Sequence, residues 1–226
     1  MDRSDGVAGL SRSREPWLRR HAANAVTLTA LIPLVVVLRP GGLAYLPLAL
    51  WAVDAIDSLD GVVARALGTS SAFGQQLDRT CDALAHGLLV ALVAAQLPGW
   101  WALAGIPTLM AMATRLTRQS MGGDKKTGAS TNELLRHLYL ALLLISSGIP
   151  AIPLLPALLL LHTLTLTWQR PMRYLLRRHA RTPARLALFY GALALPWLVP
   201  ATALPLALLF FLTWMASLLA ALGRPA

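Results

Sequence analysis

The chain has 226 residues, of which 56% are hydrophobic and only 13% are charged. This composition is too apolar for an ordinary soluble domain and instead indicates membrane-spanning helices of about 20 residues each. A net charge of +10 would suggest nucleic-acid binding in a soluble protein. Here basic and aromatic residues do not alternate, and no long apolar run presents a basic face, so we exclude a nucleic-acid partner. The single cysteine, Cys81, excludes an internal disulfide.

Residues 1–21 are predicted to form a polar N-terminus and an interfacial helix. Pro16 is a favourable first residue of a helix, and the residues after it combine Trp17 with basic side chains. An amphipathic stretch of this kind lies on a lipid surface and does not cross it.

Six apolar segments follow, separated by short breaks that contain proline, glycine or polar residues. Each is long enough to cross a membrane, which takes about 17 to 25 residues. Together they predict a six-helix catalytic membrane core over residues 22–175. The segments are 22–38, 43–64, 77–97, 100–119, 133–149 and 152–170.

Residues 176–226 are predicted to form a basic loop and an additional transmembrane hairpin. The run from Leu186 to Leu222 carries no charge and is too long for a single span. It contains Pro196, Pro200 and Pro205, and proline interrupts helical hydrogen bonding. The fold class predicted for the chain is therefore an all-α, polytopic integral membrane bundle of eight helices, preceded by the interfacial helix.

The basic residues predict how these spans are oriented. With the N-terminus inside, every lysine and arginine except Arg39 falls in a cytoplasmic segment. This is the expected arrangement because positively charged loops stay in the cytoplasm. The orientation places residues 57–82 near the cytoplasmic face, and we expect that membrane to be a bacterial inner membrane.

Four aspartates lie close together in this otherwise apolar chain. Asp57 and Asp60 are three residues apart, and Asp78 and Asp82 are four apart, so each pair lies on one helix face. Placing an ionised side chain near hydrocarbon costs a free energy of roughly a few kcal/mol or more, and a bound metal ion would offset that cost. Two facing carboxylate pairs suit Mg²⁺ or Mn²⁺ when a diphosphate substrate completes the coordination shell.

The residues around the aspartates fit such a substrate. Gly61 has no side chain, and Ala64 has a small one, so both leave room for a ligand. Arg65 offers a planar fork of donors to phosphate oxygens. Gly74 lets the third predicted helix approach the second closely.

These positions resemble the complete signature of the CDP-alcohol phosphatidyltransferases. The match occupies 26 residues, has eight fixed identities, and reads Asp57-x2-Asp60-Gly61-x2-Ala64-Arg65-x8-Gly74-x3-Asp78-x3-Asp82. The predicted architecture resembles that of the family over roughly residues 14–175, whereas the C-terminal hairpin departs from it.

The resemblance implies an enzyme that moves a phosphatidyl or other phosphoalcohol group from a CDP-linked donor, above all CDP-diacylglycerol, to a small polar alcohol. CMP is released, and family members commonly form homodimers. The implied metal ligands for two Mg²⁺ or Mn²⁺ ions are Asp57, Asp60, Asp78 and Asp82. Asp82 is also the implied base that deprotonates the acceptor hydroxyl. The implied nucleotide and diphosphate site is Gly61, Ala64, Arg65 and Gly74.

Recognition of the acceptor alcohol is left open. Arg115, Arg118 and Lys126 could bind a phosphorylated or carboxylated acceptor, or could equally contact anionic lipid headgroups. Asn24 and Thr27 resemble a polar pair that family members carry near the nucleotide, although such residues also form ordinary bonds between helices.

Two other functions share some of these features. A membrane prenyltransferase also binds a diphosphate through Mg²⁺ and aspartates, but its aspartate clusters are usually far apart in the chain. A transporter with intramembrane carboxylates would spread them across the membrane depth. The signature aspartates of this chain are instead confined to residues 57–82.

Overall fold

The protein is all-helical in the computed structural model, which describes residues 17–69, 71–121, 128–170, 172 and 182–223. No strand occurs within these ranges, and the predicted all-α fold is confirmed. In chain order the helices are α1 (Trp17–Thr29), α2 (Ile32–Leu38), α3 (Leu46–Leu67), α4 (Ala72–Ala95), α5 (Gly105–Ser120), α6 (Thr131–Ser146), α7 (Leu154–Thr167), α8 (Pro183–Leu198) and α9 (Ala203–Leu222). Short 3₁₀ turns cover Gly42–Tyr45, Gly99–Ala104 and Pro200–Thr202.

The first predicted span, 22–38, differs from the structure at its start and in its middle, and it ends with α2 at Leu38. α1 begins at Trp17 and continues past residue 21, so part of the predicted interfacial helix and the start of the first span form one helix. That helix stops at Thr29, and α2 begins at Ile32 with Pro33 in its first turn. Proline has no N–H to bond to the preceding turn, which explains the break.

Short polar side chains cap the N-termini of two later helices, α6 and α8. Ser130 precedes α6, and its hydroxyl accepts a bond from the backbone N–H of Glu133. Thr182 precedes α8 in the same way, with Pro183 as the first helical residue. Both arrangements satisfy an N–H that has no partner inside the helix.

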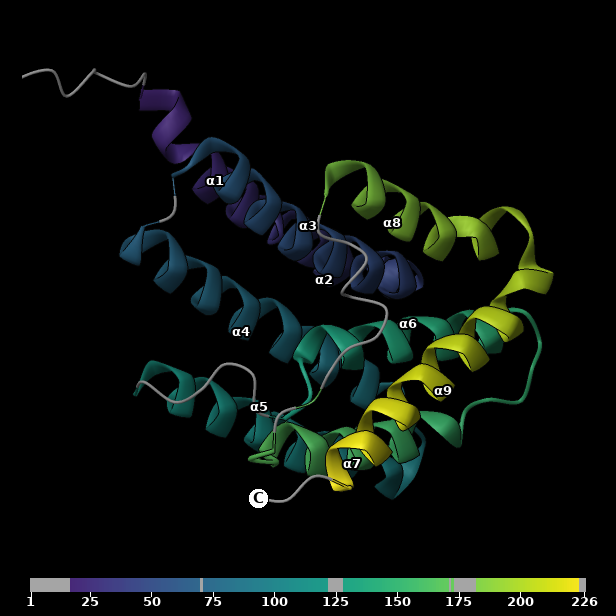
Figure 1. Ribbon diagram of the computed structural model, residues 1–226. Helices are drawn as coiled ribbons and strands as arrows, with labels where there is room; N and C mark the ends of the chain where they lie inside the picture. The colour runs from purple at the N-terminus through teal and green to yellow at the C-terminus, as the bar shows by residue number, and fades with distance from the viewer. Residues whose placement is uncertain (1–16, 70, 122–127, 171, 173–181, 224–226) are drawn as a thin grey trace, which may run out of the picture.

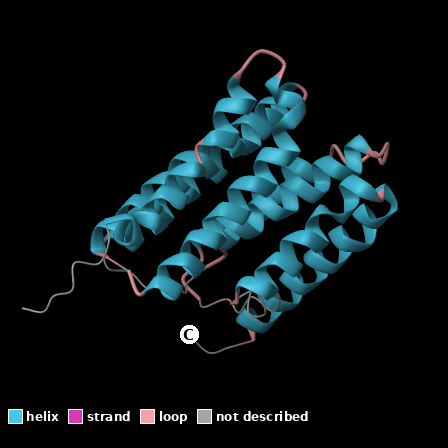
Figure 2. Cartoon of the chain, turned by 90° about the horizontal axis from the view of Figure 1, so that it is seen from above, coloured by secondary structure: helices cyan, strands magenta, loops and turns pink. Residues whose placement is uncertain are grey.

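The core lies where α3, α4 and α6 meet. Leu50, Leu89, Leu134 and Leu138 are fully buried there, and α1 and α2 cover another side of α3. Figure 2 shows the helices running alongside one another as a bundle. This packing holds α3 and α4, which carry the signature aspartates, against α6 in the interior.

The hairpin α8–α9 packs against the core by both of its helices (Figure 1). α8 lies against α3, and the hydroxyl of Tyr139 on α6 donates to the backbone oxygen of Leu193 on α8 at 2.6 Å. α9 lies against α6, and Trp214 on α9 stacks on His162 of α7 with ring centroids 4.5 Å apart. The hairpin is therefore an integral part of the bundle.

Two helical stretches are long and apolar enough to cross a membrane, by length and composition: His21–Leu38 and Pro200–Leu222. α7 is apolar but shorter. Large apolar side chains such as Val35, Leu188 and Leu198 project from the surface. An apolar exterior of this kind is suited to lipid.

Candidate active site

The turn between α3 and α4 brings the two pairs of aspartates together. Gly68 ends α3 with φ +65°, a left-handed conformation that glycine adopts without strain. Ser71 then caps α4, because its hydroxyl accepts a bond of 2.9 Å from the N–H of Gly74. α4 consequently runs back along α3, with which it is in contact.

Three carboxylates form a compact cluster. Asp57, Asp60 and Asp78 each offer an oxygen, and these oxygens all lie within 4.8 Å of one another. Asp60 is buried, and Thr27 of α1 donates a hydrogen bond of 2.6 Å to its Oδ2. Hard oxygen ligands at this separation could hold a divalent cation such as Mg²⁺ or Mn²⁺. The donor set therefore fits the metal that the signature implies.

Asp82 lies beside this cluster and not inside it. Its carboxyl group lies close enough to that of Asp57 for the two to interact electrostatically. Asp82 is absent from the group of three whose oxygens converge, and it lines a separate cavity on the other side of α4. The structure thus puts Asp82 between the carboxylate cluster and that second cavity.

The first cavity, which we name the signature cavity, has a volume of about 190 Å³ and lies between α1, α3 and α4. A Cβ on Gly74 would come within 2.9 Å of the Asn24 Oδ1 and 3.1 Å of the Ser71 Oγ, so a side chain there would crowd the wall. All four predicted nucleotide positions and both residues of the α1 polar pair line it, next to two of the clustered aspartates. The lining includes Asn24, Thr27, Asp60, Gly61, Ala64, Arg65, Gly74 and Asp78.

The second cavity, which we name the arginine cavity, has a volume of about 260 Å³ and lies between α4, α5 and the start of α6. Its polar lining combines positive groups with the candidate base. His86 is fixed in the wall by a contact of 2.8 Å between its Nδ1 and the Thr131 hydroxyl. The polar residues that line it are Arg79, Asp82, His86, Arg115, Gln119 and Thr131.

The predicted acceptor residues separate in the structure. Arg115 is buried and lines the arginine cavity. Arg118 instead lines a shallow hollow with Ala113 and Thr117, away from Asp82. Lys126 lies outside the described residues.

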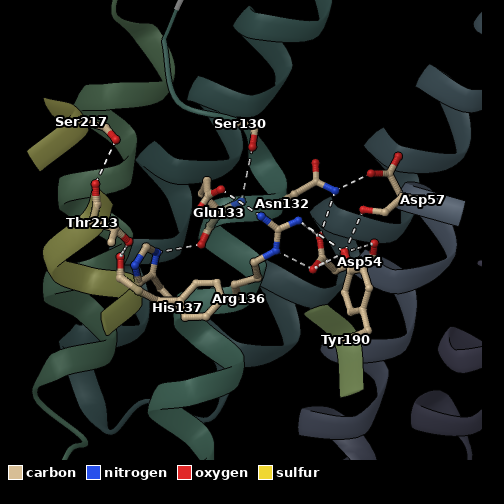
Figure 3. Close-up of polar contacts among 12 residues, drawn as sticks. Asp54, Asp57, Ser130, Asn132, Glu133, Arg136, His137, Tyr190, Thr213 and Ser217 are labelled. Carbon is tan, nitrogen blue, oxygen red and sulfur yellow. Dashed lines mark hydrogen bonds and ion pairs between the residues drawn. The ribbon is translucent and has the colours of Figure 1, made fainter. Parts of the chain in front are cut away.

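A buried polar network lies behind Asp57, and its members from α6 and α8 were not predicted from the sequence (Figure 3). Arg136 of α6 is buried, and it pairs with Asp54 of α3 at 2.7 Å. Asn132 of α6 donates to both Asp54 and Asp57. An arginine and an asparagine inside an apolar helix were the available signal, since such groups are buried only with partners.

Comparisons with known proteins agree with this geometry. The family model described as CDP-alcohol phosphatidyltransferase matches residues 20–169. A phosphatidylinositol phosphate synthase from Mycobacteroides abscessus is 35% identical over 100 residues, which are 41% of this chain and 40% of that protein. The chain thus spans well under two thirds of that curated relative in the match. The comparisons favour the transferase hypothesis over the prenyltransferase and transporter alternatives. The chain belongs to the CDP-alcohol phosphatidyltransferases, a family of phosphotransferases.

Proposed function

We propose that this protein is an integral-membrane phospholipid synthase that transfers a phosphatidyl group from CDP-diacylglycerol to a small phosphorylated alcohol and releases CMP. The observation that carries the proposal is the position of the carboxylate cluster. Asp60 and Asp78 line the signature cavity, and Asp82, close to Asp57, lines the arginine cavity. Two substrates could therefore bind in neighbouring cavities, one lined by clustered aspartates and the other by Asp82.

The signature cavity is the proposed donor site. Gly61, Ala64 and Gly74 leave space for the cytidine diphosphate, and Arg65 donates to its phosphate oxygens. The proposed cofactors are two Mg²⁺ or Mn²⁺ ions held by Asp57, Asp60 and Asp78, with Asp82 sharing in their binding. When bound, the ions would offset charge on the diphosphate and on the departing CMP.

Asp82 is the proposed general base. It accepts the proton of the acceptor hydroxyl while that oxygen forms a bond to the lipid-linked phosphorus. The bond between this phosphorus and the bridging oxygen breaks, and CMP leaves with the electron pair. A base needs only hydrogen-bonding reach of the hydroxyl, and this role is supported by the position of Asp82 on the wall of the cavity proposed for the acceptor.

The arginine cavity is the proposed acceptor site. Arg79 and Arg115 supply two guanidinium groups near Asp82, and guanidinium binds phosphate through paired hydrogen bonds. Inositol phosphate is the acceptor we favour, because the Mycobacteroides relative is named as a phosphatidylinositol phosphate synthase. Arg118 and Lys126 are assigned to lipid headgroups in this proposal.

The proposed setting is a bacterial inner membrane crossed eight times, with the N-terminus and the carboxylates on the cytoplasmic side. Support comes from the two long apolar helices, the projecting apolar side chains and the one-sided distribution of basic residues. The homodimer implied by the family stays a prediction.

The test is CMP release by the purified full-length protein in lipid vesicles. We expect turnover with CDP-diacylglycerol and inositol phosphate, loss of turnover in EDTA, and recovery with Mn²⁺ or Mg²⁺. Unphosphorylated inositol and glycerol phosphate serve as comparison acceptors, and a soluble CDP-alcohol serves as comparison donor. The absence of metal-dependent CMP release with every pair, or transfer from a prenyl diphosphate, would contradict the proposal.

A further inference from the structure

A buried ion pair lies one helical turn from the carboxylate cluster. Arg136 of α6 holds Asp54 of α3 through two bonds, from Nε to Oδ2 at 2.7 Å and from Nη2 to Oδ1 at 2.9 Å. The side chain of Arg136 is 3% exposed and that of Asp54 is 2% exposed. A pair so completely removed from water is favourable only if its remaining hydrogen-bonding capacity is used.

The hairpin helix α8 provides further hydrogen bonds to both members of the ion pair through Tyr190. The Tyr190 hydroxyl lies 2.8 Å from both the Oδ2 and the backbone oxygen of Asp54. A hydroxyl has one hydrogen and can accept two more bonds. Ser58 at 2.7 Å and the Arg136 Nη2 at 3.3 Å occupy the accepting positions. The neighbouring Phe189 lies under the guanidinium at 5.1 Å, within the range of a cation–π contact.

Asn132 connects the ion pair to the cluster. Its Nδ2 donates to Asp54 Oδ1 at 3.0 Å and also to Asp57 Oδ2 (Figure 3). Carboxylate oxygens only accept, so the amide nitrogen must face both, and its two hydrogens are then used. Asp54 in turn accepts bonds on both oxygens from Asn132, Arg136 and Tyr190. An unbroken chain of bonds runs from α8 to Asp57.

We infer that the C-terminal hairpin holds a metal ligand in place: Tyr190 fixes the Asp54–Arg136 pair, and Asn132 transmits this to the carboxylate of Asp57. Tyr190 and Asn132 are thus positioning residues, and the inference rests on the proposed metal centre. Fixing a ligand before the metal arrives lowers the entropy lost on binding. The matched family region ends at residue 169, so the hairpin that supplies Tyr190 lies outside it.

The test compares two tyrosines that both join the core to α8. Tyr190→Phe removes the hydroxyl from the network, and Tyr139→Phe removes the hydroxyl that bonds Leu193 on the same helix. Mn²⁺ binding to the full-length protein is measured by electron paramagnetic resonance, without substrate. We expect Tyr190→Phe to raise the Mn²⁺ Kd by about threefold to tenfold. Tyr139→Phe should leave the Kd within about twofold of the wild-type value.

Two further measurements separate positioning from mere destabilisation. Saturating Mn²⁺ should restore CMP release by Tyr190→Phe, because the bound state is intact once formed. Asn132→Ala keeps Tyr190 and its bonds to Asp54, yet it should weaken Mn²⁺ binding by about tenfold or more. This variant decides the question if Tyr190→Phe does not fold.

The inference is overturned if Tyr190→Phe and Tyr139→Phe bind Mn²⁺ equally, or if Asn132→Ala binds it like the wild type. The proposed function stands in both cases, provided the wild type binds Mn²⁺ and releases CMP. A wild-type protein that binds no Mn²⁺ would overturn the metal centre together with the inference.

Discussion

The signature cavity and the arginine cavity both take part of their lining from α4, but the chain builds them differently. Apart from Ala23, Asn24 and Thr27, every lining residue of the signature cavity comes from positions 60–78. The arginine cavity takes its lining from α4, from α5 and from Thr131 at the start of α6. A local motif thus forms the proposed donor site, whereas packing of distant helices forms the proposed acceptor site.

The difference has a chemical reason. To bind a diphosphate and two cations, a site needs metal-ligand oxygens and hydrogen-bond donors that lie close together in a fixed arrangement. Two helices joined by a short turn can provide them. An acceptor alcohol needs a cavity of particular shape with a few well-placed polar groups. Such a cavity depends on how α5 lies against α4, because Arg115 and Asp82 come from those two helices.

The largest expected effect comes from removing one carboxylate of the proposed metal cluster, on which transfer from one cavity to the other depends. Asp60→Asn keeps the size of the side chain but removes its charge from the cluster with Asp57 and Asp78. We expect kcat for CMP release to fall about a thousandfold, equivalent to about 4 kcal/mol of transition-state stabilisation. Mn²⁺ affinity should fall with it, as checked by electron paramagnetic resonance. A variant with an unchanged melting temperature and at least a tenth of wild-type kcat, roughly, would place the metal elsewhere.

A smaller effect should be confined to the acceptor side. Arg115→Ala removes a guanidinium from the arginine cavity. We expect the KM for inositol phosphate to rise about tenfold to a hundredfold, with the KM for CDP-diacylglycerol nearly unchanged. Steady-state kinetics with each substrate varied in turn measure this split.

Arg118→Ala is the matched control for this variant, because Arg118 lies three residues later on α5 and lines the separate hollow. Its KM values should stay within about twofold of the wild type. Equal effects of the two substitutions would show that general positive charge, and not the arginine cavity, recruits the acceptor.

The smallest effect should be confined to the donor side. Gly74→Ala places a Cβ 2.9 Å from the Asn24 Oδ1, so the Asn24 side chain in the wall of the signature cavity must shift. We expect the KM for CDP-diacylglycerol to rise about threefold to tenfold, with the KM for inositol phosphate unchanged. Initial rates of CMP release at varied donor concentration measure it.

Gly191→Ala on α8 is the control, because nothing lies within 4 Å of its added Cβ. That variant should keep wild-type kinetics and gain a little stability, since alanine favours helix. Donor kinetics that respond equally to both alanines would remove the distinction between the two cavities.

Much of the proposed donor site follows from spacing alone. Aspartates three or four residues apart share a helix face, and the short turn around Gly68 brings two such faces together. The prediction for Arg115 and Arg118 was less specific. Side chains three residues apart on a helix point in directions that differ by about 60° around the helix axis. Near the edge of a cavity, this difference decides whether an arginine lines that cavity or the neighbouring hollow.

The buried network lay beyond sequence reasoning for a different reason. Asp54 and Arg136 are 82 positions apart, and Tyr190 is 136 positions from Asp54. Periodicity shows which residues share a face of one helix, but it does not show which helix covers that face. The sequence therefore does not show that Arg136 is buried against α3 and α8.

The sequence by itself determined the family signature, the all-helical character and the close spacing of the carboxylates, because each depends on residues close together in the chain. Only the tertiary structure decided where Asp82 lies relative to the cluster, which arginine lines the second cavity, and how the hairpin reaches Asp57. These depend on the contacts between helices, which are set by the packing of whole side-chain surfaces and not by any local run of residues.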